Sequence, residues 1–300
     1  MEYDVIIVGG GPSGMTAALY ALRFDKKVLI LEKEAFGGQI ATSPRVENYP
    51  SIKAITGLEL SNNMFDQILD LGASFELEDV VSIYKSDDIF EVKTNYNLYL
   101  GKVVIIANGV HHRKLNVPNE EKLIGKGVYY CAVCDGPFYK GQETCVIGDA
   151  NSALQYALML SAYCPKVNLL TLFDKLFAEN YLIDKIKAKD NIVVRHNLNL
   201  KQFKGEDHLK QLIFEDTKTK ETVTYNTNNV FVAIGQIPDN DKFKNVVDIE
   251  NGYIVTDENM ETKTKGLFAI GDTRKKEVRQ VATAINDGAI AATKALKYLD

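Results

Sequence analysis

Residues 4–32 carry the pattern that most strongly constrains the fold of this chain. Residues 4–8 form a short β-branched run that is typical of a buried parallel strand, and Gly-Gly-Gly-Pro-Ser-Gly follows at 9–14. Residues 15–23 then read as an alanine-rich helix, and 27–32 read as a second strand that ends in a carboxylate. This order predicts a βαβ unit with the spacing of a dinucleotide-binding turn.

Four residues of this unit have separate physical tasks. Gly9 allows a tight turn, Gly11 lets the backbone approach a pyrophosphate, and Gly14 lets helix and strand pack closely. The start of the helix attracts phosphate charge, and Glu32 can accept a hydrogen bond from a ribose hydroxyl. The alternative is a glycine-rich turn without a ligand. Because strand, turn, helix and acid are all present, we predict dinucleotide binding.

The composition narrows the class of protein. The 300 residues are enough for two domains, and the hydrophobic (46%) and charged (25%) fractions are those of a globular chain. A net charge of −5 disfavours nucleic acid as a partner, and no apolar run approaches the ~20 residues of a membrane span. The acidic N-terminus runs straight into a strand, so we expect no signal peptide and a cytoplasmic location.

Cys131 and Cys134 form a C-x-x-C, which indicates redox chemistry in a chain without a disulfide scaffold. Their spacing allows a disulfide across a helix start, and one thiol of such a motif is usually acidified to the attacking thiolate. The alternative is half of a zinc site, which would need a second C-x-x-C or a histidine pair. We therefore predict no metal site and interpret Cys145 and Cys164, expected on a strand and a helix, as small core residues.

Polar loops and a late strand extend the first domain. Gly37-Gly38-Gln39 and the loop at 47–50 resemble loops that contact a flavin, and residues 267–272 form a buried strand that ends in Gly-Asp. The joints between domains are expected at 107–109 and 233–238, where apolar strands end in glycine. The predicted domains are 1–112 with 239–300, and 113–238.

These motifs together resemble the low-molecular-weight thioredoxin reductase family. The resemblance covers essentially the whole chain and is carried, in order, by G-G-G-P-S-G, G-G-Q, E-N-Y-P, C-A-V-C-D-G, V-A-I-G-x-x-P, A-I-G-D and R-Q-x-x-T-A. It implies an α/β fold of two Rossmann-like, three-layer ββα domains, with a discontinuous FAD-binding domain and a central redox domain. It also implies a homodimer whose central domain carries both the C-x-x-C and an NADPH site, and rotates to bring either one to the flavin.

The resemblance assigns roles to individual residues. It implies that Cys134 faces the flavin, that Cys131 attacks the disulfide of thioredoxin, and that Asp135 exchanges a proton with the leaving thiolate. Asp272 is expected to meet the ribityl chain of FAD, and a last helix is expected at 282–299. The residues implied to bind FAD are Gly9, Gly11, Pro12, Ser13, Gly14, Glu32, Gly38, Gln39, Asn48, Ala107, Gly271, Asp272, Arg279, Gln280 and Val281.

A second glycine turn, at 148–153, departs from the family pattern. Members carry G-x-G-x-x-A here for nicotinamide binding, and Gly148 and Ala153 keep its first and last positions. Ala150 replaces the glycine that admits the pyrophosphate. Asp149 would place a carboxylate near two phosphate charges, where repulsion at an effective dielectric of about 20 is on the order of several kcal/mol.

The phosphate clamp is also missing after the next strand. NADPH-using members carry H-R-R-x-x-x-R there, since arginine binds a phosphate bidentately. The aligned residues are Thr171, Leu172, Phe173 and Phe177. An NADH site would end this strand in an acid, but Asp174 lies three residues after Thr171. The alternative is a divergent NADPH site that uses Lys166 or Lys175.

The pattern is most similar to the ferredoxin-dependent, pyridine-nucleotide-independent branch of the family. It implies that reduced ferredoxin passes electrons to FAD, that FAD reduces the Cys131–Cys134 disulfide, and that the dithiol reduces thioredoxin. Because ferredoxins are acidic, Arg274-Lys275-Lys276 and Arg279 are the best candidates for docking. The alternative is that these cations form a solvated loop of mixed charge.

Other functions stay open at this point. An NAD(P)H-dependent thioredoxin reductase with a divergent pocket fits the same motifs, and so does a related flavoprotein with an unknown donor. A flavin-bound regulatory protein without turnover is disfavoured by the intact C-A-V-C-D. A ferredoxin–NADP reductase of the same fold is disfavoured because it would not need the C-x-x-C.

Overall fold

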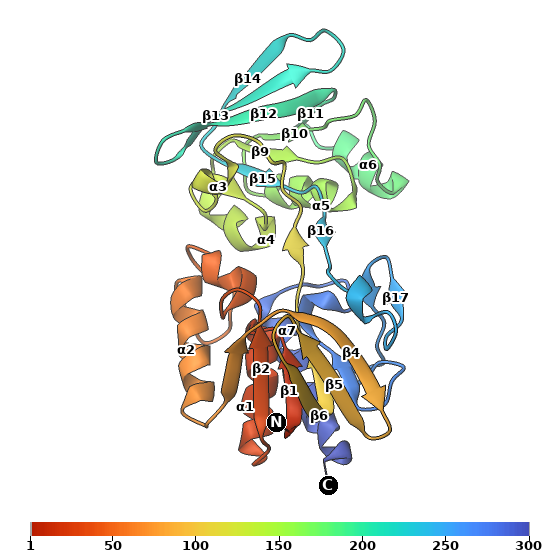
Figure 1. Ribbon diagram of the computed structural model, residues 1–300. Coiled ribbons are helices and arrows are strands. Elements are labelled where there is room, and N and C mark those ends of the chain that lie inside the picture. Colours follow the sequence, from red (N-terminus) through yellow and green to blue (C-terminus); the bar gives the residue numbers. More distant parts are fainter. Residues whose placement is uncertain (1, 300) are drawn as a thin grey trace. The chain divides into compact units, whose positions relative to one another are not determined.

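The computed structural model describes residues 2–299, and the chain divides into two compact units (Figure 1). The first unit contains the chain up to His111 and from Ile237 onward, and the second is His112–Gln236. Each unit contains a sheet of parallel strands, so the α/β fold expected from the sequence is confirmed. No helix within residues 2–299 combines the length and the apolar character that a membrane span requires.

Two short strands carry the chain from one unit to the other. They are β7 (His111–His112) and β16 (Gln236–Ile237). Gly109 and Gly235 precede these strands and adopt positive φ angles of 64° and 105°, a conformation that glycine adopts without steric cost. The boundaries expected from the sequence, after residues 112 and 238, lie within two residues of the division after His111 and Gln236.

The sheet of the first unit has the order β3-β2-β1-β6-β5-β4, and β19 pairs with β6. Its centre is parallel, whereas β4, β5 and β6 form an antiparallel arm. The strands are β1 (Glu2–Val8), β2 (Val28–Glu32), β3 (Ser74–Leu77), β4 (Val80–Ser86), β5 (Ile89–Thr94), β6 (Leu98–Ile106) and β19 (Leu267–Ala269), with a separate hairpin of β17 (Ile249–Glu250) and β18 (Tyr253–Ile254).

Both faces of this sheet are covered. Val5 and Ile7 of β1 pack with the helices, whereas Ile6 and Val8 pack with residues of the antiparallel arm, which explains why the strand is apolar throughout. The helices are α1 (Pro12–Arg23), α2 (Gly57–Leu69) and α7 (Val281–Ala295), with 3-10 turns η1 (Gly38–Thr42), η3 (Asp241–Phe243), η4 (Gly271–Thr273) and η5 (Leu296–Tyr298). Alanines on α1 and α7 meet in one core cluster, so these two helices pack closely.

The second unit has a five-stranded sheet of order β11-β10-β9-β15-β8 and a three-stranded antiparallel sheet, β12-β13-β14. The strands are β8 (Val128–Tyr129), β9 (Thr144–Ile147), β10 (Val167–Leu170), β11 (Ile192–Arg195), β12 (Leu198–Gly205), β13 (Leu209–Asp216), β14 (Thr222–Asn226) and β15 (Val230–Val232). The helical segments are α3 (Glu120–Leu123), α4 (Ala132–Asp135), η2 (Gly136–Tyr139), α5 (Asn151–Leu160) and α6 (Asn180–Lys187).

This unit forms three layers, with the antiparallel sheet on one face of the parallel sheet and helices α5 and α6 on the other (Figure 1). Alternate residues of β9 define the layers, because Val146 packs toward α5 and Cys145 packs toward β12 and β13. The expectation of Cys164 on a helix is wrong, because α5 ends at Leu160. Pro165 follows Cys164 and disfavours a helical conformation in the preceding residue.

Candidate active site

The first glycine turn joins β1 to α1. Gly9 has a φ of 113°, and a Cβ there would lie 2.3 Å from the carbonyl oxygen of Ala107. A Cβ on Gly14 would lie 2.0 Å from the carbonyl oxygen of Gly9, so both positions require glycine for the fold itself. A Cβ on Gly11 would meet no atom within 4 Å. Gly11 therefore borders open space at the start of α1, where a pyrophosphate needs room.

Glu32 fixes the end of β2 beside this turn. Its Oε2 accepts a hydrogen bond from the Gly10 amide at 2.7 Å, and its Oε1 accepts one from the Glu34 amide at 2.9 Å. Each carboxylate oxygen can accept a second hydrogen bond. Glu32 is therefore held in place and keeps the capacity to bind a ribose hydroxyl.

The η4 turn brings a second carboxylate to the start of α1. Gly271 has a φ of 72°, and a Cβ there would lie 2.5 Å from Ser13 Oγ. Asp272 Oδ1 is buried and has no hydrogen-bond partner within the described residues, and burial raises the pKa of this carboxyl group. Because an unpartnered buried oxygen is costly, this atom fits a ligand that supplies a hydroxyl donor, as the ribityl chain of FAD does.

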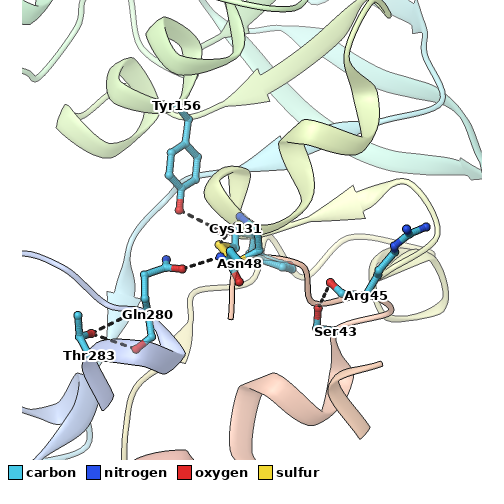
Figure 2. Close-up of a disulfide and its surroundings, with 9 residues drawn as sticks. Ser43, Arg45, Asn48, Cys131, Tyr156, Gln280 and Thr283 are labelled. Atoms are coloured by element: carbon cyan, nitrogen blue, oxygen red, sulfur yellow. Dashed lines mark hydrogen bonds between the residues drawn. A yellow bond between two sulfur atoms is a disulfide. The ribbon is translucent and has the colours of Figure 1, made fainter. Parts of the chain in front are cut away.

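The two polar loops lie against the same elements. Gly38 faces Gly11, since a Cβ on Gly38 would lie 3.5 Å from Gly11 Cα, and Gln39 Nε2 donates to the carbonyl oxygen of Val110. Figure 2 shows the hydrogen bond of 3.0 Å from Asn48 Nδ2 to Gln280 Oε1. Gln280 caps α7, which begins at Val281, and Arg279 Nε donates to the Asp272 carbonyl oxygen at 3.4 Å. The structure thus brings the proposed FAD-binding residues together around the start of α1, where Pro12 and Ser13 lie.

Cys131 and Cys134 are joined by a disulfide at the start of α4 (Figure 2), with their Cα atoms 5.3 Å apart. Cys131 is the N-cap residue, and its Sγ accepts a hydrogen bond from the Cys134 amide at 3.1 Å. Asp135 ends this short helix, and burial raises its pKa to about 7. Its Oδ1 has no hydrogen-bond partner in the part of the chain that the structure describes. A carboxyl group with this pKa can both donate and accept a proton near neutral pH.

Tyrosines that the sequence analysis did not single out lie beside this acid. Tyr156 of α5 donates a hydrogen bond of 3.3 Å to the carbonyl oxygen of Tyr130, which directly precedes Cys131 (Figure 2). Burial raises the pKa of Tyr139 and of Tyr156, and the charge of Asp135 contributes in both cases. Tyr156 lies in the helix after the second glycine turn. Because the recognisable motif is confined to the turn, no signal in the sequence pointed to this tyrosine.

The second glycine turn keeps its backbone shape. Gly148 has a φ of 146°, and a Cβ there would lie 2.4 Å from the carbonyl oxygen of Ala233. Ala150 is extended and serves as the N-cap residue of α5 without a side-chain cap. Burial raises the pKa of Asp149, whose carbonyl oxygen accepts a hydrogen bond of 2.7 Å from the Phe177 amide.

The segment after β10 folds against this turn through its own contacts. Asn151 Nδ2 donates to Glu179 Oε1 at 3.0 Å, and the Glu179 amide donates to Asn151 Oδ1 at 2.9 Å. Leu172, Phe173 and Phe177 are 44%, 49% and 51% exposed. The start of α5 therefore has two carboxylates nearby, from Asp149 and Glu179, and apolar side chains at the positions of the missing cations.

The lysines that could replace those cations already have partners. Lys166 Nζ lies 2.8 Å from Glu143 Oε1, and Lys175 Nζ lies 5.0 Å from the centre of the Phe177 ring. Lys166 is therefore not a free cation for the phosphate in the alternative of a divergent NADPH site. Within residues 2–299, no group of three or more histidine, cysteine, aspartate and glutamate side chains is placed to hold a metal ion.

The prediction of an exposed basic docking patch is wrong for two of its residues. The side chains of Arg274 and Lys276 are only 15% and 10% exposed, and both form ion pairs with Asp287. Lys275 is exposed and lies 2.6 Å from Glu250. The run of cations looks like a surface patch in the sequence because the buried acid that holds two of them lies on a different element.

Comparison with known proteins decides the family. The sequence profile of the pyridine nucleotide-disulphide oxidoreductases matches residues 3–288. A thioredoxin reductase of Bacillus subtilis is 39% identical, with 99% of this chain and 95% of the relative covered. The chain belongs to the thioredoxin reductase family. A Clostridium pasteurianum protein described as a 34.2 kDa protein in the rubredoxin operon is 38% identical, with 99% and 97% covered.

A solved structure supports the same assignment. The crystal structure of thioredoxin reductase from Streptococcus pyogenes MGAS5005 is 37% identical and matches with a TM-score of 0.95, covering 99% of this chain and 98% of that one. Thioredoxin reductases of this family are flavoprotein disulfide oxidoreductases that bind FAD. The expectations of the family and of FAD are thus confirmed. The open space at Gly11 and the unpartnered oxygen of Asp272 fit this cofactor.

Proposed function

We propose that this enzyme reduces thioredoxin through FAD and the Cys131–Cys134 dithiol, with reduced ferredoxin rather than NADPH as the electron donor. One contrast carries the proposal. The disulfide and its buried acid are present in the second unit, whereas the second glycine turn of the same unit carries Asp149 and residues 171–177 contain no arginine. The enzyme has kept its electron outlet and has lost the usual nicotinamide inlet.

FAD would be held by the first glycine turn, Glu32, the two polar loops, η4 and the start of α7. When bound, it supplies the exchange between the single electrons of an iron–sulfur carrier and the electron pair that a disulfide requires. Asp272 and Glu32 would orient it through its hydroxyl groups. No residue of this group lies in the second unit, so the proposed FAD site does not depend on the altered turn.

The cysteines then transfer the electron pair to thioredoxin. Reduction of the Cys131–Cys134 disulfide takes up two electrons and two protons, and Asp135 is the residue placed to exchange protons there. The Cys131 thiolate attacks the thioredoxin disulfide, forms a mixed disulfide and releases one thioredoxin thiol. Cys134 attacks this mixed disulfide, which releases the second thiol and restores the original pair.

Electrostatics disfavours NADPH and NADH at the second turn. A dinucleotide pyrophosphate would lie at the start of α5, beside Asp149 and near Glu179. Residues 171–177 contain no arginine that could neutralise a 2′-phosphate. Because like charges a few ångströms apart repel by on the order of several kcal/mol at an effective dielectric of about 20, we expect nicotinamide affinity to be lost.

An NAD(P)H-dependent thioredoxin reductase is the second candidate, because relatives from several organisms are named thioredoxin reductase without a stated donor. The experiment compares donors anaerobically by the decrease in flavin absorbance. Millimolar NADPH or NADH should leave the absorbance unchanged over minutes, whereas reduced ferredoxin should bleach it and support thioredoxin reduction. Reduced rubredoxin serves as a second iron–sulfur donor, since one relative is described as encoded in a rubredoxin operon.

Rapid stoichiometric bleaching by NADPH would overturn the donor assignment and leave an ordinary thioredoxin reductase. We also propose a homodimer, for which light scattering should give twice the chain mass of 33.4 kDa. A monomer across the micromolar range would contradict that part. The cytoplasmic location stays a prediction.

A further inference from the structure

Asp287 of α7 is a buried acid at the base of the η4 turn. It is 3% exposed, and its Oδ2 accepts hydrogen bonds from the Gly271 amide at 3.1 Å and from Lys276 Nζ at 2.9 Å. Arg274 Nη1 lies 3.4 Å from its Oδ1. One carboxylate thus holds a main-chain amide and two cations, all of them within six residues of the proposed FAD-binding Gly271 and Asp272.

Each cation has a second partner that fixes its position. Arg274 Nε donates to Thr256 Oγ1 at 3.0 Å, and Lys276 Nζ donates to Thr283 Oγ1 at 3.3 Å. Removing such charges from water is costly unless they are paired, yet two cations here share one acid. The group of Arg274, Lys276 and Asp287 consequently keeps a net positive charge in a largely buried place.

This charge acts on the carboxylate that the cofactor needs. Burial raises the pKa of Asp272, the positive charges of Lys276 and Arg279 oppose this effect, and the negative charge of Asp287 adds to it. The Gly271 amide that Asp287 holds belongs to the residue directly before Asp272. Asp287 and Lys276 therefore influence both the conformation of the turn and the charge around its carboxylate, and Arg274 helps to hold Asp287 in place.

We propose that Asp287, Arg274 and Lys276 are positioning residues that hold the Gly271–Asp272 turn ready for FAD, and that their net positive charge favours the reduced, more negatively charged flavin. The proposal rests on FAD binding and not on ferredoxin as the donor. It also assigns a task to cations that the sequence suggested for partner docking.

The test compares two neighbouring lysines that differ in burial. Lys276→Gln removes one buried charge and keeps a hydrogen-bond donor for Asp287, whereas Lys275→Gln removes an exposed charge. For each variant, the dissociation constant of FAD is measured by adding FAD to the cofactor-free protein, and the midpoint potential is measured anaerobically against reference dyes.

Lys276→Gln should weaken FAD binding at least tenfold and shift the two-electron reduction equilibrium about tenfold toward oxidised flavin, which corresponds to about 30 mV. Lys276→Arg should restore the potential, and Lys275→Gln should match the wild type. Equal behaviour of the two glutamine variants, or wild-type values for Lys276→Gln, would overturn the proposal. Neither result depends on which donor reduces the flavin. This proposal and the proposed electron donor can therefore be refuted separately.

Two further variants separate positioning from charge. Asp287→Ala removes the acceptor of the Gly271 amide and should weaken FAD binding more than Asp287→Asn, which keeps an acceptor oxygen. Thr256→Val loosens Arg274 without changing any charge and carries the test if Lys276→Gln does not fold. It should weaken FAD binding at least threefold with no change in potential, and an unchanged dissociation constant would contradict the positioning role.

Discussion

Gly9 and Gly148 occupy equivalent places in the two glycine turns of this chain. Both adopt positive φ angles, and a Cβ on either would lie within 2.4 Å of the carbonyl oxygen of an adjoining segment, that of Ala107 or of Ala233. The turns differ two residues later, where Gly11 borders open space and Ala150 carries a methyl group. They differ also in charge, because residues 9–14 contain no acid and the second turn contains Asp149.

This comparison separates two requirements that usually occur together. The close approach of strand and helix is needed for the fold, and both turns keep the glycine that permits it. Room and neutral charge for a pyrophosphate are needed only for a ligand, and at these positions the second turn carries an acid, Asp149, and a methyl group, that of Ala150. Under the proposed function, this strand–turn–helix unit has lost its ligand and still supports the layer that carries the disulfide.

The largest expected effects come from substitutions at the Cys131–Cys134 disulfide of the second unit. Cys131→Ser should abolish thioredoxin reduction and trap no mixed disulfide, because the attacking thiol is gone. Cys134→Ser should also abolish turnover but should let Cys131 form a stable mixed disulfide with thioredoxin. Mass spectrometry of the non-reduced complexes distinguishes the two. Trapping by the Cys131 variant instead would reverse the roles, and undiminished activity in both would contradict the dithiol mechanism.

Glycine substitutions compare the two turns directly. Gly14→Ala should abolish FAD binding, because its Cβ would lie 2.0 Å from the Gly9 carbonyl oxygen. Gly148→Ala should destabilise the second unit and leave FAD bound. Gly11→Ala is the control, which should leave the stability of the cofactor-free protein unchanged and weaken FAD binding by about 1.4 kcal/mol or more, a tenfold change. Flavin absorbance and thermal unfolding report the outcomes, and a yellow Gly14→Ala protein would contradict the comparison.

Asp135→Asn tests the buried acid that the second unit has retained. Thioredoxin reduction should fall about 10²-fold, the low end for loss of general acid–base catalysis. Because burial raises the folded-state pKa to about 7, the unfolded chain loses this proton first as pH rises. Relative to Asp135→Asn, the wild type should therefore lose stability between about pH 4 and pH 7, by up to about 4 kcal/mol. Parallel stability profiles for the two proteins would rule out a raised pKa.

Restoring the family residues should move the second turn toward the first in function. A variant with Asp149→Gly, Ala150→Gly, Leu172→Arg, Phe173→Arg and Phe177→Arg removes one acid and adds three phosphate-binding cations. Flavin bleaching by NADPH should become at least about tenfold faster than in the wild type, since arginine contributes bidentate phosphate binding. The rate with reduced ferredoxin is the internal control. No gain with NADPH would mean that the loss lies elsewhere in the chain.

Ala150→Gly alone should have the smallest effect. Ala150 is extended, with a φ of −108°, and glycine is tolerated at a helix N-cap. The free energy of unfolding should therefore change by less than about 0.5 kcal/mol. The negative charge of Asp149 and the absence of the arginines should still prevent NADPH binding. Calorimetric titration with NADPH measures this affinity. Measurable NADPH affinity in this variant would show that the methyl group, and not charge, closes the site.

The sequence predicted the first turn well because its requirements are local. A positive φ at Gly9, a helix that begins with Pro12 and a carboxylate at the end of β2 all leave a short-range pattern. The fate of Lys276 was not predictable in the same way. Its partner Asp287 lies on α7, and only the packing of η4 against that helix turns an apparent surface charge into a buried one.

The surroundings of the disulfide and of Asp135 show the same limit. The C-x-x-C and Asp135 stand out in the sequence as adjacent residues, but their tyrosine surroundings come from η2 and α5 after folding. The sequence did contain the information needed to place Cys164 outside the helix, because Pro165 directly follows it. The unpartnered oxygen of Asp272 could not have been foreseen, because only a three-dimensional structure shows which hydrogen-bond partners are missing.

The burial of Cys145 and Cys164 gives the enzyme a simple chemical readout. Both residues are 2% exposed or less, and burial raises the pKa of Cys145 to about 12, so neither is available to an alkylating reagent in the folded protein. Labelling under native conditions reports only on Cys131 and Cys134. The added mass of the intact chain therefore counts electron pairs delivered to the disulfide, whichever donor supplied them, and does so without relying on the colour of the flavin.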